Sequence, residues 1–248
     1  MKNLALLDSP RRFKGLDYRH AFQPIIRPSS GEIFGYEVLL RGPQEQPPWF
    51  IFERISPSDK AKFEHTINET ALTYSHLLGN EKLLFINVLP ETLLLDQGQY
   101  LIDLWKSQPH QVDPTQIVIE LSESGLQRDI RALSRALDLL RSAGFVIALD
   151  DFGAGSAGLN SLVDVNPDII KLDMHLVRSI HESGVRQVLI KSVLSFADAL
   201  GILVLAEGVE TVAEYNHLRN LGIDLFQGYL FAHPKIDYLA RTFHLPIF

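Results

Sequence analysis

The sequence predicts an α/β fold, specifically a (β/α)8 barrel of the TIM type whose opening strands are irregular. About eight apolar runs of strand length occur along the chain, and stretches with helical periodicity separate most of them. No linker or low-complexity segment interrupts this alternation. With 248 residues, of which 46% are apolar, the chain can form the core of one such barrel. An open, doubly wound sheet is the alternative, because it produces the same alternation.

The chain is expected to open with a β-hairpin. Residues 19–26 and 33–41 have strand character, and the turn-forming segment Pro28-Ser-Ser-Gly31 joins them. Strands joined by so short a turn run antiparallel, which makes the opening strand pair of the barrel irregular. We assign residues 1–17 to an N-terminal leader and residues 18–248 to the barrel.

Five elements are predicted between this hairpin and the middle of the chain. Phe63, Ile67 and Ala71 begin an apolar stripe at helical spacing, and Gly144 provides a stop signal for a later helix. In order, the predicted elements are a helix at residues 59–78, a strand at 83–88, a helical stretch to residue 108, a strand at 117–121 and a helix at 126–143.

The second half of the chain continues the alternation. The apolar, partly β-branched run that starts at Phe145 predicts a strand buried on both faces, as in a parallel sheet. Gly201 ends a long helical stretch. The predicted elements are the strand from residue 145, a helix at 156–163, a strand at 168–172, a helix at 185–200, a strand at 202–206, a helix at 212–221 and a short strand at 224–226.

Two adjacent aspartates, Asp150 and Asp151, follow the buried strand from Phe145 directly. Side-by-side carboxylates cost folding energy through repulsion unless a cation lies between them. A plain acidic turn is the simple alternative. The pair has the chemistry to bridge two cations about 3.5–4 Å apart, which is the arrangement used for displacement at phosphoesters.

Polar side chains also lie at the ends of nearly all the remaining predicted strands. In a barrel, the carboxyl ends of the strands meet at one mouth, where catalytic groups collect. Carboxylate and amide oxygens, in a chain without cysteine or paired-histidine spacing, favour Mg²⁺ or Mn²⁺. The strand-end residues are Glu37, Arg41, Asn87, Glu120, Asp150, Asp151, Lys171, Glu207 and Gln227.

A glycine pattern in this region imitates a dinucleotide-binding fingerprint. Gly153, Gly155 and Gly158 have the G-x-G-x-x-G spacing, and Asp173 follows about 20 residues later. The two aspartates before these glycines would repel a pyrophosphate, so we reject this interpretation. We expect a tight glycine turn that lets the backbone approach the metal site.

Composition excludes several classes of protein. A formal net charge of −7 argues against general nucleic-acid binding. The absence of cysteine excludes disulfides and thiolate chemistry. The apolar runs are too short to span a membrane, and the start of the chain does not have the pattern of a signal peptide. We therefore expect a cytoplasmic protein that is not bound to a membrane.

The polar strand ends belong to a series of short motifs. They are Gln23-Pro-Ile25, Glu37-Val-Leu-Leu-Arg41, Phe-Ile-Asn87-Val, Glu120-Leu-Ser-Glu123, Asp150-Asp-Phe-Gly-Ala-Gly155, Lys171-Leu-Asp173, Glu207-Gly-Val-Glu210 and Gln227-Gly-Tyr229. In this order and spacing, over about residues 18 to 240, the chain resembles the EAL-domain cyclic di-GMP phosphodiesterases. The resemblance implies metal-dependent hydrolysis of cyclic di-GMP, a bacterial second messenger, to linear pGpG on a modified TIM barrel with one reversed strand.

The resemblance also implies roles for individual residues. Two Mg²⁺ or Mn²⁺ ions are expected to activate the attacking water, with Asp150 bridging them, and Ca²⁺ is expected to inhibit. Lys171, Glu37, Glu207 and Glu123 would form the catalytic group, in which Lys171 contacts the water and Glu123 anchors the loop after Asp151. The implied metal ligands are Glu37, Asn87, Glu120, Asp150, Asp151 and Glu207, and the implied substrate-side residues are Gln23, Leu39, Arg41, Asp173, Glu210 and Gln227.

The chain departs from the family pattern at two places, and other functions stay open. The signature Glu-Ala-Leu has Val38 in its centre, and the glycine loop continues as Gly155-Ser-Ala-Gly-Leu. The alternatives are a catalytically silent cyclic di-GMP receptor, a protein-interaction regulator on the same barrel, or an unrelated Mg²⁺-dependent barrel enzyme acting on enolates. A homodimer is expected through residues 156–163, with Ala154, Ala157, Leu159, Leu162 and Val163 at the contact.

Overall fold

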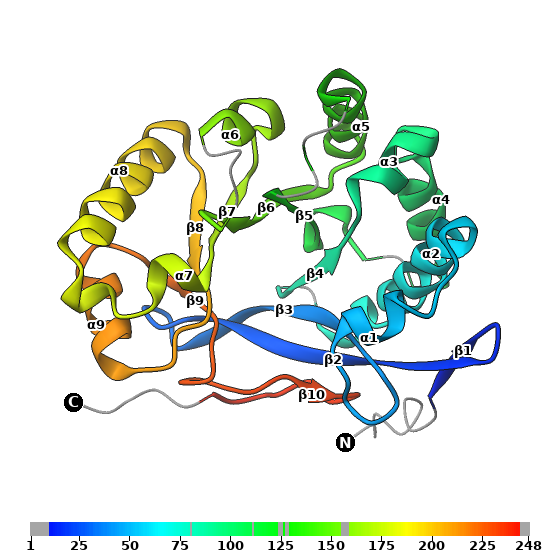
Figure 1. Cartoon of the computed structure of the whole chain (residues 1–248), viewed down its shortest axis with the longest axis horizontal. Coiled ribbons are helices and arrows are strands. Elements are labelled where there is room, and N and C mark those ends of the chain that lie inside the picture. Colours follow the sequence, from blue (N-terminus) through cyan, green and yellow to red (C-terminus); the bar gives the residue numbers. More distant parts are fainter. Residues whose placement is uncertain are drawn as a thin grey trace.

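The computed structural model describes residues 10–79, 81–110, 112–123, 126, 129–154 and 159–243. Within these residues, a barrel of strands is surrounded by helices (Figure 1). The strands are β1 (Arg11–Phe13), β2 (Leu16–Arg27), β3 (Glu32–Arg41), β4 (Leu83–Asn87), β5 (Ile117–Ser122), β6 (Val146–Phe152), β7 (Ile169–Leu172), β8 (Leu203–Ala206), β9 (Leu225–Phe226) and β10 (Lys235–Ile236). The α-helices are α1 (Pro48–Phe52), α2 (Lys60–Leu72), α3 (Pro90–Asp96), α4 (Gln99–Ser107), α5 (Ile130–Ser142), α6 (Leu159–Val165), α7 (Met174–Val177), α8 (Gly184–Leu200) and α9 (Val212–Asn220).

Strands β2 to β9 close into a barrel in sequence order. Strands β3 to β9 pair with their neighbours in parallel. Strand β2 runs antiparallel to β3 and also to β9, where Ile26 pairs with Phe226. This closure confirms the predicted barrel and its antiparallel opening pair. The alternative of an open doubly wound sheet is wrong, because such a sheet has two unpaired edges.

Strand β2 is long enough to pair with four strands. Besides β3 and β9, it pairs with β1, where Arg11 lies opposite Tyr18, and with β10, where Lys235 lies opposite Phe22. Strand β1 and Leu16 fall within the stretch that was assigned to a leader, and here they belong to the sheet. Residues 1–9 lie outside the described residues, so the leader stays a prediction for them.

The helices differ from the predicted bounds for identifiable local reasons. The helix predicted at 59–78 ends at Leu72, where the backbone tightens and the N–H groups of Thr73 and Tyr74 bond to the carbonyls three residues before them, at 3.1 and 3.0 Å. Gln97 and Gly98, with φ of 59° and 77°, divide the helical stretch before residue 108 into α3 and α4. The helix predicted at 126–143 begins at Ile130, because the Asp129 side chain caps it by accepting from the N–H of Ala132.

A layer of apolar side chains fills the inside of the barrel. Seven of the strands contribute one buried or largely buried side chain each, and β3 contributes Gly35. A Cβ atom at Gly35 would lie 2.6 Å from the carbonyl oxygen of Leu83, so only glycine lets β3 approach β4 this closely. The members of this apolar layer are Ile25, Phe85, Val118, Ala148, Ile169, Leu205 and Leu225.

The larger apolar core lies between the barrel and its helices. Alternate strand residues such as Ile119 and Ile147 face outward and pack in one cluster with Leu133 and Leu137 of α5. Burial on both faces of the strands gives the apolar runs that predicted a parallel sheet. No helix in the described part of the chain is both long and apolar enough to cross a membrane.

Candidate active site

The polar strand ends lie directly above the apolar layer. Residues two positions apart on a strand face the same side, so the residue two positions beyond each layer member also points into the barrel. On the reversed strand β2 the corresponding residue precedes the layer, so Gln23 stands above Ile25. This rule places eight side chains at one mouth, namely Gln23, Glu37, Asn87, Glu120, Asp150, Lys171, Glu207 and Gln227.

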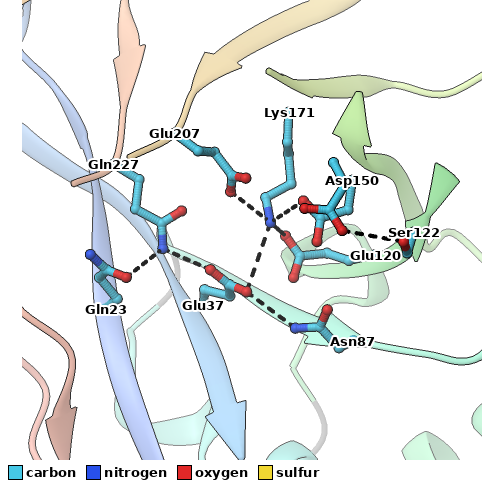
Figure 2. A network of polar contacts seen from close by, with 10 residues as sticks. Gln23, Glu37, Asn87, Glu120, Ser122, Asp150, Lys171, Glu207 and Gln227 are labelled. Carbon is cyan, nitrogen blue, oxygen red and sulfur yellow. Dashed lines mark hydrogen bonds and ion pairs between the residues drawn. The ribbon is translucent and has the colours of Figure 1, made fainter. Parts of the chain in front are cut away.

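Lys171 occupies the centre of this group (Figure 2). Its Nζ lies 2.5 Å from Oε1 of Glu120, 2.8 Å from Oε1 of Glu207 and 2.9 Å from Oδ1 of Asp150. The nearest oxygen of Glu37 is 3.8 Å away. We call Glu37, Glu120, Asp150 and Glu207 the carboxylate cluster. Four strands or strand ends that are distant in sequence thus bring their acids to one lysine.

One ammonium group cannot balance four carboxylates away from water. Lys171 exposes 1% of its surface. Burial raises the pKa of Glu120 and of Glu207 well above the usual range, even though the ammonium counteracts this effect. Burial also disfavours the charged form of Lys171, but the four carboxylates together outweigh it and hold the lysine pKa well above its usual value. The carboxylate cluster therefore attracts further positive charge, as protons or as metal cations.

Amide side chains fix the orientation of Glu37. Asn87 donates through Nδ2 to Oε1 of Glu37 at 3.2 Å, and Gln227 donates through Nε2 to Oε2 at 2.7 Å. The same Nε2 of Gln227 is 3.3 Å from Oε1 of Gln23, and Nε2 of Gln23 donates to the carbonyl of Ala232. This chain of amides leads from β4 through Glu37 to β2 and the segment after β9, and it holds the carboxylate on the side of the lysine (Figure 2).

Asp151 reaches the site because the strand is distorted there. Neighbouring residues of a regular strand point to opposite faces. Asp151 has a left-handed backbone with φ of 57°, and the register of β6 against β7 shifts between Leu149 and Phe152. Such a backbone costs about 1–3 kcal/mol in a residue other than glycine. Burial, and then the neighbouring charge of Asp150, raise the pKa of Asp151, and the hydroxyl of Ser122 donates to its Oδ2 at 3.2 Å.

Two groups of carboxylate oxygens have the spacing of cation sites. One consists of Glu37, Glu120 and Asp150, and the other of Asp150, Asp151 and Glu207. Within each group, one oxygen from each residue lies within 4.8 Å of the others. Asp150 belongs to both groups, which is the geometry required of the predicted bridging ligand.

The surroundings of the buried oxygens show whether the carboxylate cluster suits a metal ion. Both oxygens of Glu120 and Oδ1 of Asp150 are buried, and among the described residues only the Lys171 ammonium lies close enough to donate to them. Buried oxygens without donors are costly, and a coordinated cation removes that cost. The donors are all oxygen, which is the set preferred by hard divalent cations. The residues present therefore fit such ions.

The backbone after Asp151 is held by Glu123. Its Oε2 accepts a hydrogen bond from the N–H of Gly153 at 3.2 Å. Gly153 has φ of 97°, and a Cβ atom there would lie 2.4 Å from a side-chain carbon of Leu176, so this turn requires glycine. The contact joins Glu123 to the turn after Asp151, and its anchoring role in the reaction stays a prediction. Gly155 and Gly158 of the glycine pattern lie outside the described residues.

Two pockets open on either side of the carboxylate cluster, and Glu37 lines both. A pocket of about 260 Å³ is formed by Gln23, Asp151, Asp173, Glu207, Glu210 and Gln227, among others. A second pocket of about 470 Å³ lies between β3, α2 and the start of α3, and Leu39, Phe52 and Pro90 contribute to its apolar wall. Most of the predicted substrate-side residues thus line one of these two pockets.

Three predicted substrate-side residues have protein partners that the sequence did not indicate. Asp173 caps α7 by accepting from the N–H of His175 at 2.7 Å. Glu210 forms a two-point ion pair with Arg178, at 2.5 and 2.7 Å. Arg41 lines neither of the two pockets, and its Nη1 donates to the carbonyl of Leu40 at 2.8 Å. Their roles toward a substrate stay predictions.

Ser122 belongs to the site but was not predicted. It ends β5 between Glu120 and Glu123, and its hydroxyl holds Asp151. The rule that strand ends carry the site would have found it, had hydroxyl groups been considered along with acids, amides and basic residues.

Comparison with known proteins places this site in a family. Among known proteins, the chain is 32% identical to the blue light- and temperature-regulated antirepressor BluF of Escherichia coli, over 93% of the chain and 58% of BluF. It is 31% identical to the cyclic di-GMP phosphodiesterase RocR of Pseudomonas aeruginosa, over 92% of the chain and 62% of RocR. The chain therefore spans less than two thirds of the length of these relatives.

Solved structures show the same barrel. A manganese/cyclic di-GMP complex of BlrP1 from Klebsiella pneumoniae superposes with a TM-score of 0.83 at 35% identity, covering 92% of this chain and 59% of BlrP1. A cyclic di-GMP-bound standalone EAL protein from Vibrio cholerae gives a TM-score of 0.85 at 34% identity, covering 94% of this chain and 98% of that protein. The family model of the EAL domain matches residues 10–234. The chain therefore belongs to the EAL domain family.

Proposed function

We propose that this chain is a metal-dependent phosphodiesterase that hydrolyses cyclic di-GMP to linear pGpG. The observation that carries the proposal is the carboxylate cluster around Lys171, whose oxygens form two groups that share Asp150. The relatives support the choice of substrate. RocR is named a cyclic di-GMP phosphodiesterase, and the Klebsiella and Vibrio structures contain cyclic di-GMP.

Divalent cations are part of this proposal. When bound, two such ions lower the pKa of water and neutralise charge on a phosphate. Manganese accompanies cyclic di-GMP in the Klebsiella structure, and the all-oxygen donors favour Mg²⁺ or Mn²⁺ over softer metals. Ca²⁺ is larger and activates water less, so it should allow binding but inhibit turnover. The residues that would hold the ions are Glu37, Asn87, Glu120, Asp150, Asp151 and Glu207.

Lys171 would orient the attacking water. The sequence left two roles open, because a lysine can donate a hydrogen bond to water or accept its proton. The surrounding carboxylates hold the pKa of Lys171 well above its usual value, so the side chain is an ammonium in the cluster before cations bind. We therefore assign it the role of a hydrogen-bond donor to the water and to charge that develops on the phosphate.

The two pockets suit the two halves of the substrate. Cyclic di-GMP has two guanine bases on either side of its phosphodiesters, and Glu37 lies between the pockets. With one phosphate at the carboxylate cluster, one base could enter each pocket. Leu39 and Phe52 offer apolar contact on one side, and Gln23 and Asp173 offer hydrogen-bonding groups on the other.

A catalytically silent receptor or protein-interaction regulator is the second candidate. The observation that favours it is the similarity to BluF, which is named an antirepressor. All six proposed metal ligands are present in this chain, and a receptor has no need to keep all of them. Hydrolysis is therefore our first choice.

We also propose a homodimer whose contact surface extends from α6 to α8. Leu162 is buried, and Ala157 lies outside the described residues, so neither carries the proposal. Val163 of α6 exposes 74% of its surface, and Val185 and Val188 of α8 expose 81% and 66%. Isologous pairing of two copies would cover these apolar side chains. Cytoplasmic location and the absence of membrane or general nucleic-acid binding remain predictions.

The decisive experiment incubates the purified chain with cyclic di-GMP and Mg²⁺ or Mn²⁺ and separates the products by chromatography. We expect pGpG with either ion and no turnover in EDTA. Intact cyclic di-GMP that is nevertheless retained by the protein would contradict hydrolysis and favour the receptor.

A further inference from the structure

Glu64 on α2 is a buried carboxylate outside the carboxylate cluster. It exposes 1% of its surface. Its Oε1 accepts a hydrogen bond from the backbone N–H of Leu89 at 2.8 Å, and its Oε2 accepts one from Oγ1 of Thr92 at 2.5 Å. The hydroxyl of Tyr100 on α4 lies 3.5 Å from Oε1. A buried carboxylate is costly, so these contacts call for an explanation.

One strong donor, Leu89, belongs to the connection between β4 and α3, and the other, Thr92, to the first turn of α3. Leu89 is the residue that caps α3, and its apolar side chain cannot accept a hydrogen bond. Glu64 instead accepts, from another helix, the N–H of the N-cap residue, as a glutamate at the third helical position does in a capping box; here that position is Thr92, whose hydroxyl itself donates to Glu64. Asn87, the last residue of β4, lies two residues before Leu89.

Asn87 is thereby held between two backbone anchors. On the side of β5, the N–H of Val88 donates to the carbonyl of Glu120 at 3.0 Å. On the side of α2, the N–H of Leu89 donates to Glu64. Between them, the Asn87 side chain reaches Oε1 of Glu37. Loss of the Glu64 contact would leave the backbone after Asn87 fixed on one side only.

We propose that Glu64 is a positioning residue that fixes the backbone after Asn87 and so directs the Asn87 amide to the metal site. This inference rests on the proposed metal site and extends it to a helix on the outside of the barrel. Partners that orient a metal ligand without touching the ion often contribute 10-fold to 100-fold to metal affinity. Glu64 does this by holding the main chain.

The test measures Mn²⁺ binding by electron paramagnetic resonance, together with thermal unfolding. Glu64→Ala should weaken Mn²⁺ binding about 10-fold to 100-fold. Glu64→Gln should stay within about 3-fold of the unsubstituted protein, because its amide oxygen can accept from Leu89 while its amide nitrogen donates to the Thr92 hydroxyl. Thr70→Val is the matched control, since Thr70 is a buried polar residue of α2 whose hydroxyl bonds to Thr66 and Tyr18 instead of the β4–α3 connection. It should lower stability and leave Mn²⁺ affinity unchanged.

A double-mutant cycle shows whether Glu64 acts through Asn87. In an Asn87→Ala background, Glu64→Ala should weaken Mn²⁺ binding by less than about 2-fold further, because its target is already gone. If the two losses multiply, the proposal is overturned. Should Glu64→Ala not fold, Glu64→Asp takes its place, since that carboxylate is one methylene too short to reach both donors.

The outcomes separate this inference from the proposed function. If the unsubstituted protein binds no Mn²⁺, the metal site fails and the role of Glu64 fails with it. If that protein binds Mn²⁺ and Glu64→Ala binds it equally well, only the role of Glu64 is overturned.

Discussion

Replacement of Lys171 by methionine tests the electrostatic account of the site. Methionine is of similar length but uncharged, so the change leaves the buried Glu120 and Asp150 and the partly buried Glu207, now 2.5–2.9 Å from the ammonium, without a counter-charge. Removing one partner of a buried ion pair costs about 3–5 kcal/mol. The raised pKa values of Glu120 and Glu207 let these groups take up protons, so we expect the lower end, about 3 kcal/mol.

This destabilisation can be measured by thermal unfolding in EDTA. In a domain of this size, each kcal/mol lowers Tm by about 2–4 °C, so Lys171→Met should lower Tm by about 6–12 °C. Lys62→Met, at an exposed lysine of α2, should change stability by less than about 0.5 kcal/mol. The reasoning is refuted if the two variants unfold at the same temperature, because the lysine would then not be balancing the carboxylates.

The remaining predictions concern metal, charge, pH and assembly. Mg²⁺ and Mn²⁺ should support turnover and Ca²⁺ should allow binding only; full activity in excess EDTA would be inconsistent with a metal site. Asp151→Asn should keep the fold but lower kcat by about 100-fold or more. Asp129→Asn should leave kcat nearly unchanged, because asparagine caps α5 equally well. Equal kcat values for the two variants would exclude Asp151 as a metal ligand. Burial raises the pKa of Glu64 to about 7 from 4.5, so the native state binds this proton more tightly than the unfolded state. The contribution of Glu64 to stability is full below pH 4.5 and is lost as the pH rises through about 7. Over that window, the unfolding free energy of the unsubstituted protein relative to Glu64→Gln should fall by about 3 kcal/mol. If chemical denaturation gives a constant difference between the two proteins, the raised pKa is contradicted. Activity per chain should fall on dilution if the proposed dimer forms, and light scattering that reports a monomer at every concentration would end that proposal.

Much of the site was predictable because strand geometry is periodic. An apolar residue inside the barrel and a polar residue two positions further on share one face, which is why Phe85 and Asn87, or Ile169 and Lys171, could be placed from the sequence pattern. The motif resemblance added which of these polar residues belong together. Both sources depend on regular strands, and both worked where the strands are regular.

The parts that were not predictable depend on contacts between distant segments. The pairing of Glu210 with Arg178 joins the end of β8 to the segment after α7, and no local pattern indicates it. The left-handed backbone of Asp151 was not predictable either, because the alternation of a regular strand would turn one of the two aspartates away from the site. Helix ends shifted for a local reason instead, because caps such as that of Asp129 on the N–H of Ala132 decide where a helix begins.

The placement of Lys171 links the stability of the barrel to its chemistry. The carboxylate cluster stands directly above the apolar layer, where four acids without a cation would repel one another. The ammonium supplies that positive charge from within the chain. Divalent cations would compete with it for the same oxygens, and once they bind, the ammonium is free to turn toward water. Lys171→Met should therefore bind Mn²⁺ at least as tightly as the unsubstituted protein while losing turnover. Weaker Mn²⁺ binding by this variant would mean that Lys171 shapes the cluster by its contacts and does not merely balance its charge.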